Sequence, residues 1–166
     1  MTGLQIGLLI GSVAGCGWAF AGASALPRAA RGGAFLAAGV IGAALAAATM
    51  RMPARAVTGT FDGAVYGIAV TAETVGIIVT ALVLRRLGRG DWLAPAVAIL
   101  VGLHFLGLWR ATARATFIAV ALGMCLVGAV GLAVPRRQRL AVTGIGCALA
   151  LWGSVAWTLL CPVPGP

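Results

Sequence analysis

Charged residues are scarce in this chain of 166 residues, and lysine is absent altogether. Charged side chains make up 9% of the sequence, against about 25% in a typical soluble domain. Because 61% of the residues are hydrophobic, a soluble fold could not hide its apolar surface behind so few charges. The composition therefore excludes a soluble globular protein and predicts a polytopic membrane protein with the lipid bilayer as its surroundings.

The sequence also lacks the motifs of common catalytic sites. It contains no H-E-x-x-H, no G-x-S-x-G, no P-loop and no cluster of carboxylates. Its four cysteines form no C-x-x-C pair, and none stands at metal-ligand spacing from a histidine. We therefore expect no metal and no cofactor, and we assign no catalytic residue. The sequence thus favours a function other than catalysis.

Six long apolar runs are present. About 20 apolar residues of helix cross a hydrocarbon core about 30 Å thick, and each run approaches or exceeds that length. The predicted spans are residues 3–26, 33–50, 63–84, 92–109, 116–134 and 140–161. Asp91, with Pro95 shortly after it, predicts a capped start for the fourth helix. The expected fold is all-α: one domain over residues 1–166, a bundle of six transmembrane helices with short loops.

The first run contains two sequences that resemble processing sites, one ending at Cys16 and one at Ala25. Both kinds of processing require a positively charged segment before the apolar run, and no basic residue precedes Arg28. We therefore expect the first helix to be retained, with cleavage as the alternative.

All twelve basic residues are arginines, and they fall in small groups between the apolar runs. This placement favours contact with lipid headgroups, and we expect no nucleic-acid partner despite the net charge of +9. Loops one, three and five carry eight arginines and loops two and four carry four. The bias predicts that loops one, three and five are cytoplasmic and that both chain termini lie outside.

Glycines at four-residue spacing predict close helix packing. Gly3, Gly7, Gly11 and Gly15 share one face of the first helix, and Gly63 and Gly67 form a similar pair on the third. Such ridges let helices approach closely in lipid. Packing within the bundle is the plain interpretation, and a homo-oligomer joined through the first helix is the alternative.

Two ionisable residues, Glu73 and His104, lie inside apolar runs, where such groups are costly and mark candidate functional sites. Tyr66 and Thr80 lie on the same helical face as Glu73. At 1.5 Å per residue, Glu73 and His104 both lie roughly 18–20 Å from the short loop that joins their helices. We therefore predict that they form a pair, which could pass a proton, hold a solute or simply lock the two helices together.

Tryptophans near the ends of the apolar runs predict anchoring at the membrane boundary. Trp92, Trp109, Trp152 and Trp157 are the candidates. Stacking on a ligand is the alternative role.

The segment Gly102-Leu103-His104-Phe105-Leu106 resembles a G-L-H-F-L signature of uncharacterised bacterial proteins with about six transmembrane helices. The resemblance extends over the third to sixth helices and implies a mid-span acid, here Glu73, and the bacterial cytoplasmic membrane. Those proteins often have proline soon after the His-Phe pair, where this chain has Gly107. The resemblance implies no known activity.

Three classes of function remain open. A small permease or channel for an unidentified small molecule or ion fits the intramembrane acid and histidine, which would couple it to protons. A structural or regulatory membrane subunit, or a homo-oligomer, fits the glycine ridges. An intramembrane lipid-modifying enzyme fits least, because two candidate groups rarely make a catalytic site.

Overall fold

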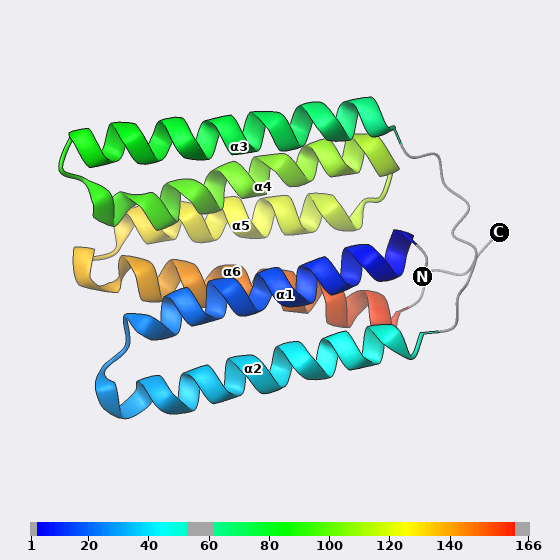
Figure 1. Cartoon of the computed structure of the whole chain (residues 1–166), viewed down its shortest axis with the longest axis horizontal. Coiled ribbons are helices and arrows are strands. Elements are labelled where there is room, and N and C mark those ends of the chain that lie inside the picture. Colours follow the sequence, from blue (N-terminus) through cyan, green and yellow to red (C-terminus); the bar gives the residue numbers. More distant parts are fainter. Residues whose placement is uncertain (1–2, 53–61, 162–166) are drawn as a thin grey trace.

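The computed structural model describes residues 3–52 and 62–161 and contains, in these two stretches, helices and no strand (Figure 1). The helices are α1 (Gly3–Ser24), α2 (Arg28–Met50), α3 (Gly63–Arg86), α4 (Leu93–Thr112), α5 (Thr116–Ala133) and α6 (Arg136–Leu160). A single 3-10 turn, η1 (Gly90–Trp92), precedes α4. All six long helices are long and apolar enough to cross a membrane. The predicted all-α fold with six spans is confirmed.

The helices extend beyond the apolar runs at their arginine-bearing ends. Helix α2 begins at Arg28 and α6 at Arg136, four to five residues earlier than predicted. Pro27 and Pro135 precede these starts, each with φ of −54°. Hydropathy marks only the part of a helix inside hydrocarbon, whereas backbone hydrogen bonding continues among the lipid headgroups, where arginine side chains reach water.

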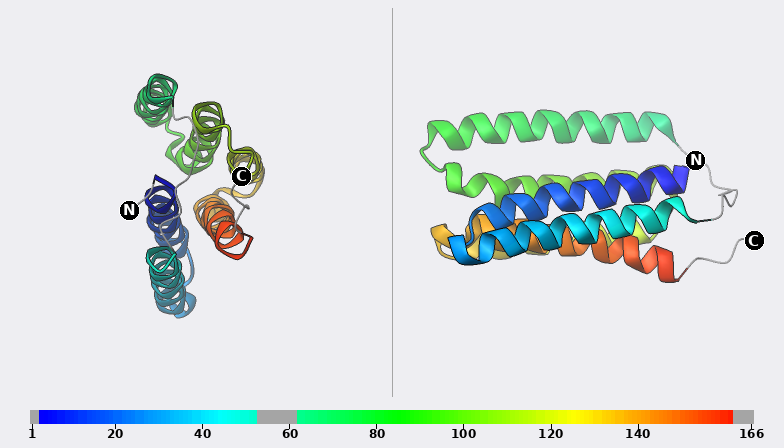
Figure 2. Two further views of the ribbon diagram at one scale, coloured as in Figure 1. Left: turned by 90° about the vertical axis from the view of Figure 1, so that its right-hand side faces the viewer. Right: turned by 60° about the horizontal axis from the view of Figure 1, so that its bottom comes forward.

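The six helices form an open arc rather than a closed ring. Viewed end on in Figure 2, their order along the arc is α3, α4, α5, α6, α1, α2, and successive helices in this order pack against each other. Helix α3 lies at one end, and its main contacts are with α4 and η1. No residue of α3 is buried. Most of the α3 surface is therefore left for lipid or for another protein.

The core lies in the middle of the arc. Ala98 of α4, Met124 of α5, and Cys147 and Leu151 of α6 form a buried cluster, against which Trp18 of α1 packs. A second cluster joins α1, α2 and α6. These clusters involve every long helix except α3, so α3 is attached to a core to which it contributes little.

Part of the glycine ridge of α1 packs against another helix of the same chain. A Cβ atom at Gly11 would lie 3.1 Å from the Val155 side chain, and one at Gly15 would overlap the Trp152 indole. Gly7 faces open space. The predicted ridge therefore packs against α6 through its second half, and a contact between copies is not needed to explain Gly11 and Gly15.

The predicted packing role of Gly63 and Gly67 is wrong within the chain. Both glycines are exposed, and a Cβ atom at Gly67 would meet nothing within 4 Å. They lie in the first turns of α3, on a helix that has one long helix as its main neighbour. A glycine spacing identifies a smooth face, but it does not supply a second helix to pack there.

Trp152 is also placed differently from the prediction. It is 7% exposed, and its Nε1–H donates to the backbone carbonyl of Ser12 at 3.1 Å. The space left by Gly15 admits the indole between α1 and α6. Trp152 therefore packs the interior rather than anchoring at the boundary, whereas Trp109 and Trp157 are exposed and their anchoring role stays a prediction.

Asp91 does not cap α4 as predicted. The N-cap of α4 is Trp92, with no side-chain hydrogen bond, and the Asp91 carboxylate instead pairs with Arg139. Arg139 also donates from Nε to the Val134 carbonyl at 3.2 Å. Arg136 Nε lies 3.4 Å from the same carboxylate. Asp91 therefore ties the α3–α4 turn to the α5–α6 turn. Its carboxylate pairs with arginines that are distant in sequence instead of capping α4.

The turns of the bundle divide between two ends. The α1–α2, α3–α4 and α5–α6 turns lie together at the left of Figure 1, and the α4–α5 turn lies at the opposite end with the start of α1 and the end of α6. The eight arginines of loops one, three and five are therefore gathered at one end. Arg55, assigned to loop two, lies outside the described residues.

Candidate functional site

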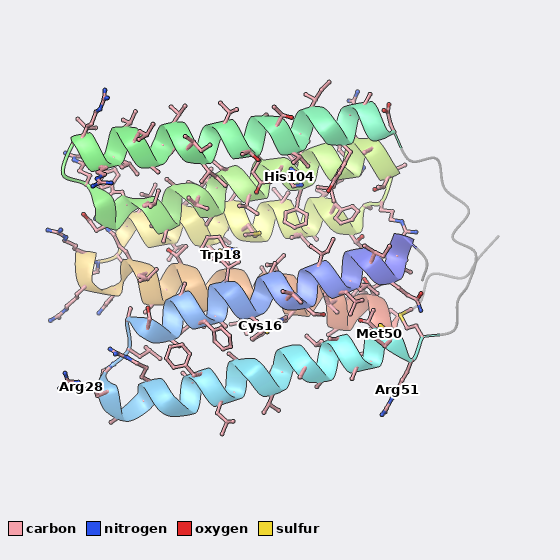
Figure 3. The ribbon with its side chains drawn as sticks, viewed as in Figure 1. Cys16, Trp18, Arg28, Met50, Arg51 and His104 are labelled. Atoms are coloured by element: carbon pink, nitrogen blue, oxygen red, sulfur yellow. The ribbon has the colours of Figure 1, made fainter. Side chains whose placement is uncertain are left out.

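Glu73 and His104 are in direct contact. Nδ1 of His104 lies 3.2 Å from Oε2 of Glu73, and the two side chains are 11% and 20% exposed, respectively. Glu73 is the eleventh residue of the 24-residue α3, and His104 lies near the middle of α4, where Figure 3 labels it. The predicted contact between the two residues is confirmed, and it lies at mid-span of both helices.

The contact has the distance of an ion pair without the geometry of a hydrogen bond. Nδ1 of His104 is buried and makes no hydrogen bond in the described part of the chain, although Oε2 of Glu73 is close enough to accept one. A hydrogen bond requires the acceptor to lie near the N–H direction, so distance alone does not make one. The site therefore holds an ionisable pair with unused hydrogen-bonding capacity.

Small residues on both sides of the pair explain why α3 and α4 approach here. A Cβ atom at Gly107 would lie 2.5 Å from the Ala69 Cβ, and one at Gly76 would lie 3.4 Å from the Leu100 side chain. As residue numbers rise along α3 they fall along α4, which is the register of two antiparallel neighbours. Glu73 and His104 occupy the layer between these two contacts. The absence of a side chain at Gly107 thus permits the close approach of α3 and α4.

Aromatic rings adjoin the pair on α3 and α4 and extend to one more helix, α5. The rings of Tyr66 and His104 have centroids 6.3 Å apart and meet edge to face. Phe105 follows at 6.0 Å from His104, and Phe117 of α5 stacks 6.0 Å from Phe105. The sequence predicts only that Tyr66 shares the helical face of Glu73, and the structure places its ring against His104. Two of these residues are not among the predicted site residues: Phe105, which adjoins His104 in sequence, and Phe117, for which no local signal exists.

The other polar residues of α3 do not join the pair. Thr80 lies two helical turns from Glu73, about 10 Å along the axis. The hydroxyls of Thr71 and Thr74 donate to carbonyls of their own helix, Gly67 and Val70, at 2.8 and 2.9 Å. The polar side chains of the site among the described residues are therefore Glu73, His104 and Tyr66.

The side chains of this site can exchange protons and can bind a cation or a hydrogen-bonding solute. A carboxylate accepts protons and cations, and an imidazole both donates and accepts. No group of three histidine, cysteine, aspartate or glutamate side chains in the described residues could hold a metal ion. The phenol of Tyr66, whose ring meets that of His104, is the third polar side chain among the contacts described above.

A comparison with known proteins finds no matching family model, no matching curated protein and no matching solved structure.

Proposed function

We propose that this chain is a small permease or channel of the bacterial cytoplasmic membrane that moves protons, or exchanges them for another small cation, at Glu73 and His104. The observation that carries the proposal is the contact between these residues at mid-span, where ionisable groups are costly and therefore mark a functional site by default. The resemblance of residues 102–106 to bacterial six-helix proteins is the basis for the choice of membrane.

The way α3 is attached supports transport over a purely structural lock. The main helix contact of α3 is with α4, and none of its residues is buried. A displacement of α3 would change access to the pair while the clusters joining the other helices stay intact. Transport requires such a change of access at a fixed central site.

A flux experiment tests the proposal. The purified protein is reconstituted in vesicles loaded with a pH-sensitive dye, and a pH gradient is imposed with Na⁺ or K⁺ on the opposite side. We expect the internal pH to change at least ten-fold faster than in empty vesicles, and Glu73→Gln to lose most of this rate because an amide carries no exchangeable acidic proton.

The matched control is Thr74→Val, which removes a polar group next to Glu73 whose hydroxyl serves only its own helix among the described contacts. This variant should keep the wild-type rate. A wild-type rate equal to that of empty vesicles, or an unchanged rate in Glu73→Gln, would contradict the proposal.

A second candidate function is a structural or regulatory membrane subunit. The open arc favours it, because α3 at one end has no buried residue and could receive another membrane protein or a second copy. Under this alternative the pair only fastens α3 to α4, and the vesicles containing the protein would show no flux.

We further propose that the arginine-rich end of the bundle is cytoplasmic, because basic loops are retained on that side. Cys161, which is exposed at the end of α6, should then react with a membrane-impermeant maleimide in intact cells. Ala30→Cys, made in a Cys161→Ser background, should react only after lysis. Rapid labelling of position 30 in intact cells would invert this topology.

A further inference from the structure

The arginine-rich end of the bundle carries a large excess of positive charge. Eight arginines lie at this end, and Asp91 is the one acidic residue among them. The arginines are Arg28, Arg31, Arg85, Arg86, Arg89, Arg136, Arg137 and Arg139. At the opposite end the described residues include Arg51, Arg110 and Arg114, together with Asp62. Anionic groups are therefore attracted far more strongly to the first end.

Asp91 cannot neutralise this excess, because it is a single acidic residue among eight arginines. Arg139 pairs with one carboxylate oxygen, and its side chain is only 15% exposed. Arg139 is therefore occupied by the protein itself. Arg136 uses only Nε toward Asp91 and is 76% exposed. A guanidinium has five N–H donors, so the terminal nitrogens of Arg136 remain available to an outside acceptor.

A depression lies at this position. It has a volume of about 670 Å³, opens to the surface, and is lined by Asp91, Pro135, Arg136 and Arg137. The pocket thus combines two arginines of the α6 start with a carboxylate that holds one of them in place. Guanidinium groups bind phosphate oxygens through paired N–H donors.

We propose that this depression binds the phosphate headgroup of an anionic phospholipid, with Arg136 and Arg137 donating to its oxygens. Leu140, the first apolar residue of α6, follows Arg136 by four residues, which is about 6 Å along the helix. Trp92 lies beneath Arg89 and Arg139, with its ring 4.8 and 5.1 Å from their guanidinium carbons. A tryptophan flanked by arginines is typical of headgroup depth, which favours lipid over a soluble phosphate.

Lipid binding in a neutral detergent tests this site independently of transport. Binding of fluorescent phosphatidylglycerol is measured for the wild type, for Arg136→Gln/Arg137→Gln and for Arg110→Gln/Arg114→Gln at the opposite end. We expect the first double variant to bind about ten-fold more weakly or worse, since each arginine near an anionic surface contributes about a five-fold change. The control should bind as the wild type does, and fluorescent phosphatidylcholine should bind all three weakly.

A single variant distinguishes a loss of lipid binding from a folding defect. Arg137 takes no part in the contacts of Asp91 described above, so Arg137→Gln should keep the wild-type elution profile and lose about five-fold in affinity. Unchanged binding in both variants, or equal losses in the control, would overturn the site. Full competition by millimolar inorganic phosphate would overturn the assignment to a lipid.

Discussion

His104→Leu is expected to destabilise the protein by about 1–3 kcal/mol, because it leaves the Glu73 carboxyl without its partner in an apolar interface. Glu73→Leu should cost a similar amount, because it removes the carboxyl whose Oε2 lies 3.2 Å from the buried Nδ1 of His104. The double variant should be close to wild type, since replacing both partners by apolar groups removes the unpaired polar atom. The coupling energy, measured by denaturation in detergent, should be about 1–3 kcal/mol.

Thr80→Leu is the matched control, because Thr80 shares the α3 face of Glu73 and lies about two turns away. Combined with His104→Leu, it should give effects that simply add. If the losses of stability in the two single variants simply add in the Glu73→Leu/His104→Leu double variant, the 3.2 Å contact has no energetic consequence. If the double leucine variant is stable and yet inactive in the flux experiment, the pair serves transport rather than fastening.

Gly144→Ala is expected to lower the free energy of unfolding by about 3 kcal/mol, at the upper end of overpacking costs. A Cβ atom at position 144 would lie 2.5 Å from the Gly22 nitrogen and 2.6 Å from its Cα. Backbone atoms cannot rotate away as a flexible side chain does, so α1 and α6 would have to separate. Thermal unfolding of the purified protein should show the loss as a fall in Tm of several degrees.

Gly153→Ala provides the control on the same helix. A Cβ atom at this position would meet nothing within 4 Å, and alanine favours a helix over glycine by up to about 1 kcal/mol in soluble hosts. The Tm should therefore stay unchanged or rise. A wild-type Tm in Gly144→Ala would show that α1 and α6 do not cross at Gly22 and Gly144.

The depth of residues in the membrane could be predicted from the sequence. Apolar runs of about 20 residues locate the spans, and 1.5 Å per residue converts a count from the shared loop into depth. Counted in this way, Glu73 and His104 lie at the same depth, and the structure brings them together. Eight arginines likewise fall in three loops of the sequence, and the structure gathers these loops at one end.

The lateral arrangement of the helices could not be predicted from the sequence. A leucine or glycine face that meets lipid has the same composition as one that meets another helix, since both surroundings are apolar. Gly15 therefore did not reveal that it admits Trp152, nor did Gly67 reveal that it faces open space. Phe117 joins the rings beside His104 from a different helix, with no local pattern to mark it.

Sequence by itself thus determined the number of spans, the depth of the ionisable residues and the segregation of the arginines, because each follows from local hydropathy and chain length. Only the tertiary structure decided that Asp91 serves Arg139 instead of its own helix, and that α3 ends an open arc. Those outcomes depend on which segments, distant in the chain, come within a few ångströms of each other. Packing of side chain against side chain decides that, and hydropathy does not record it.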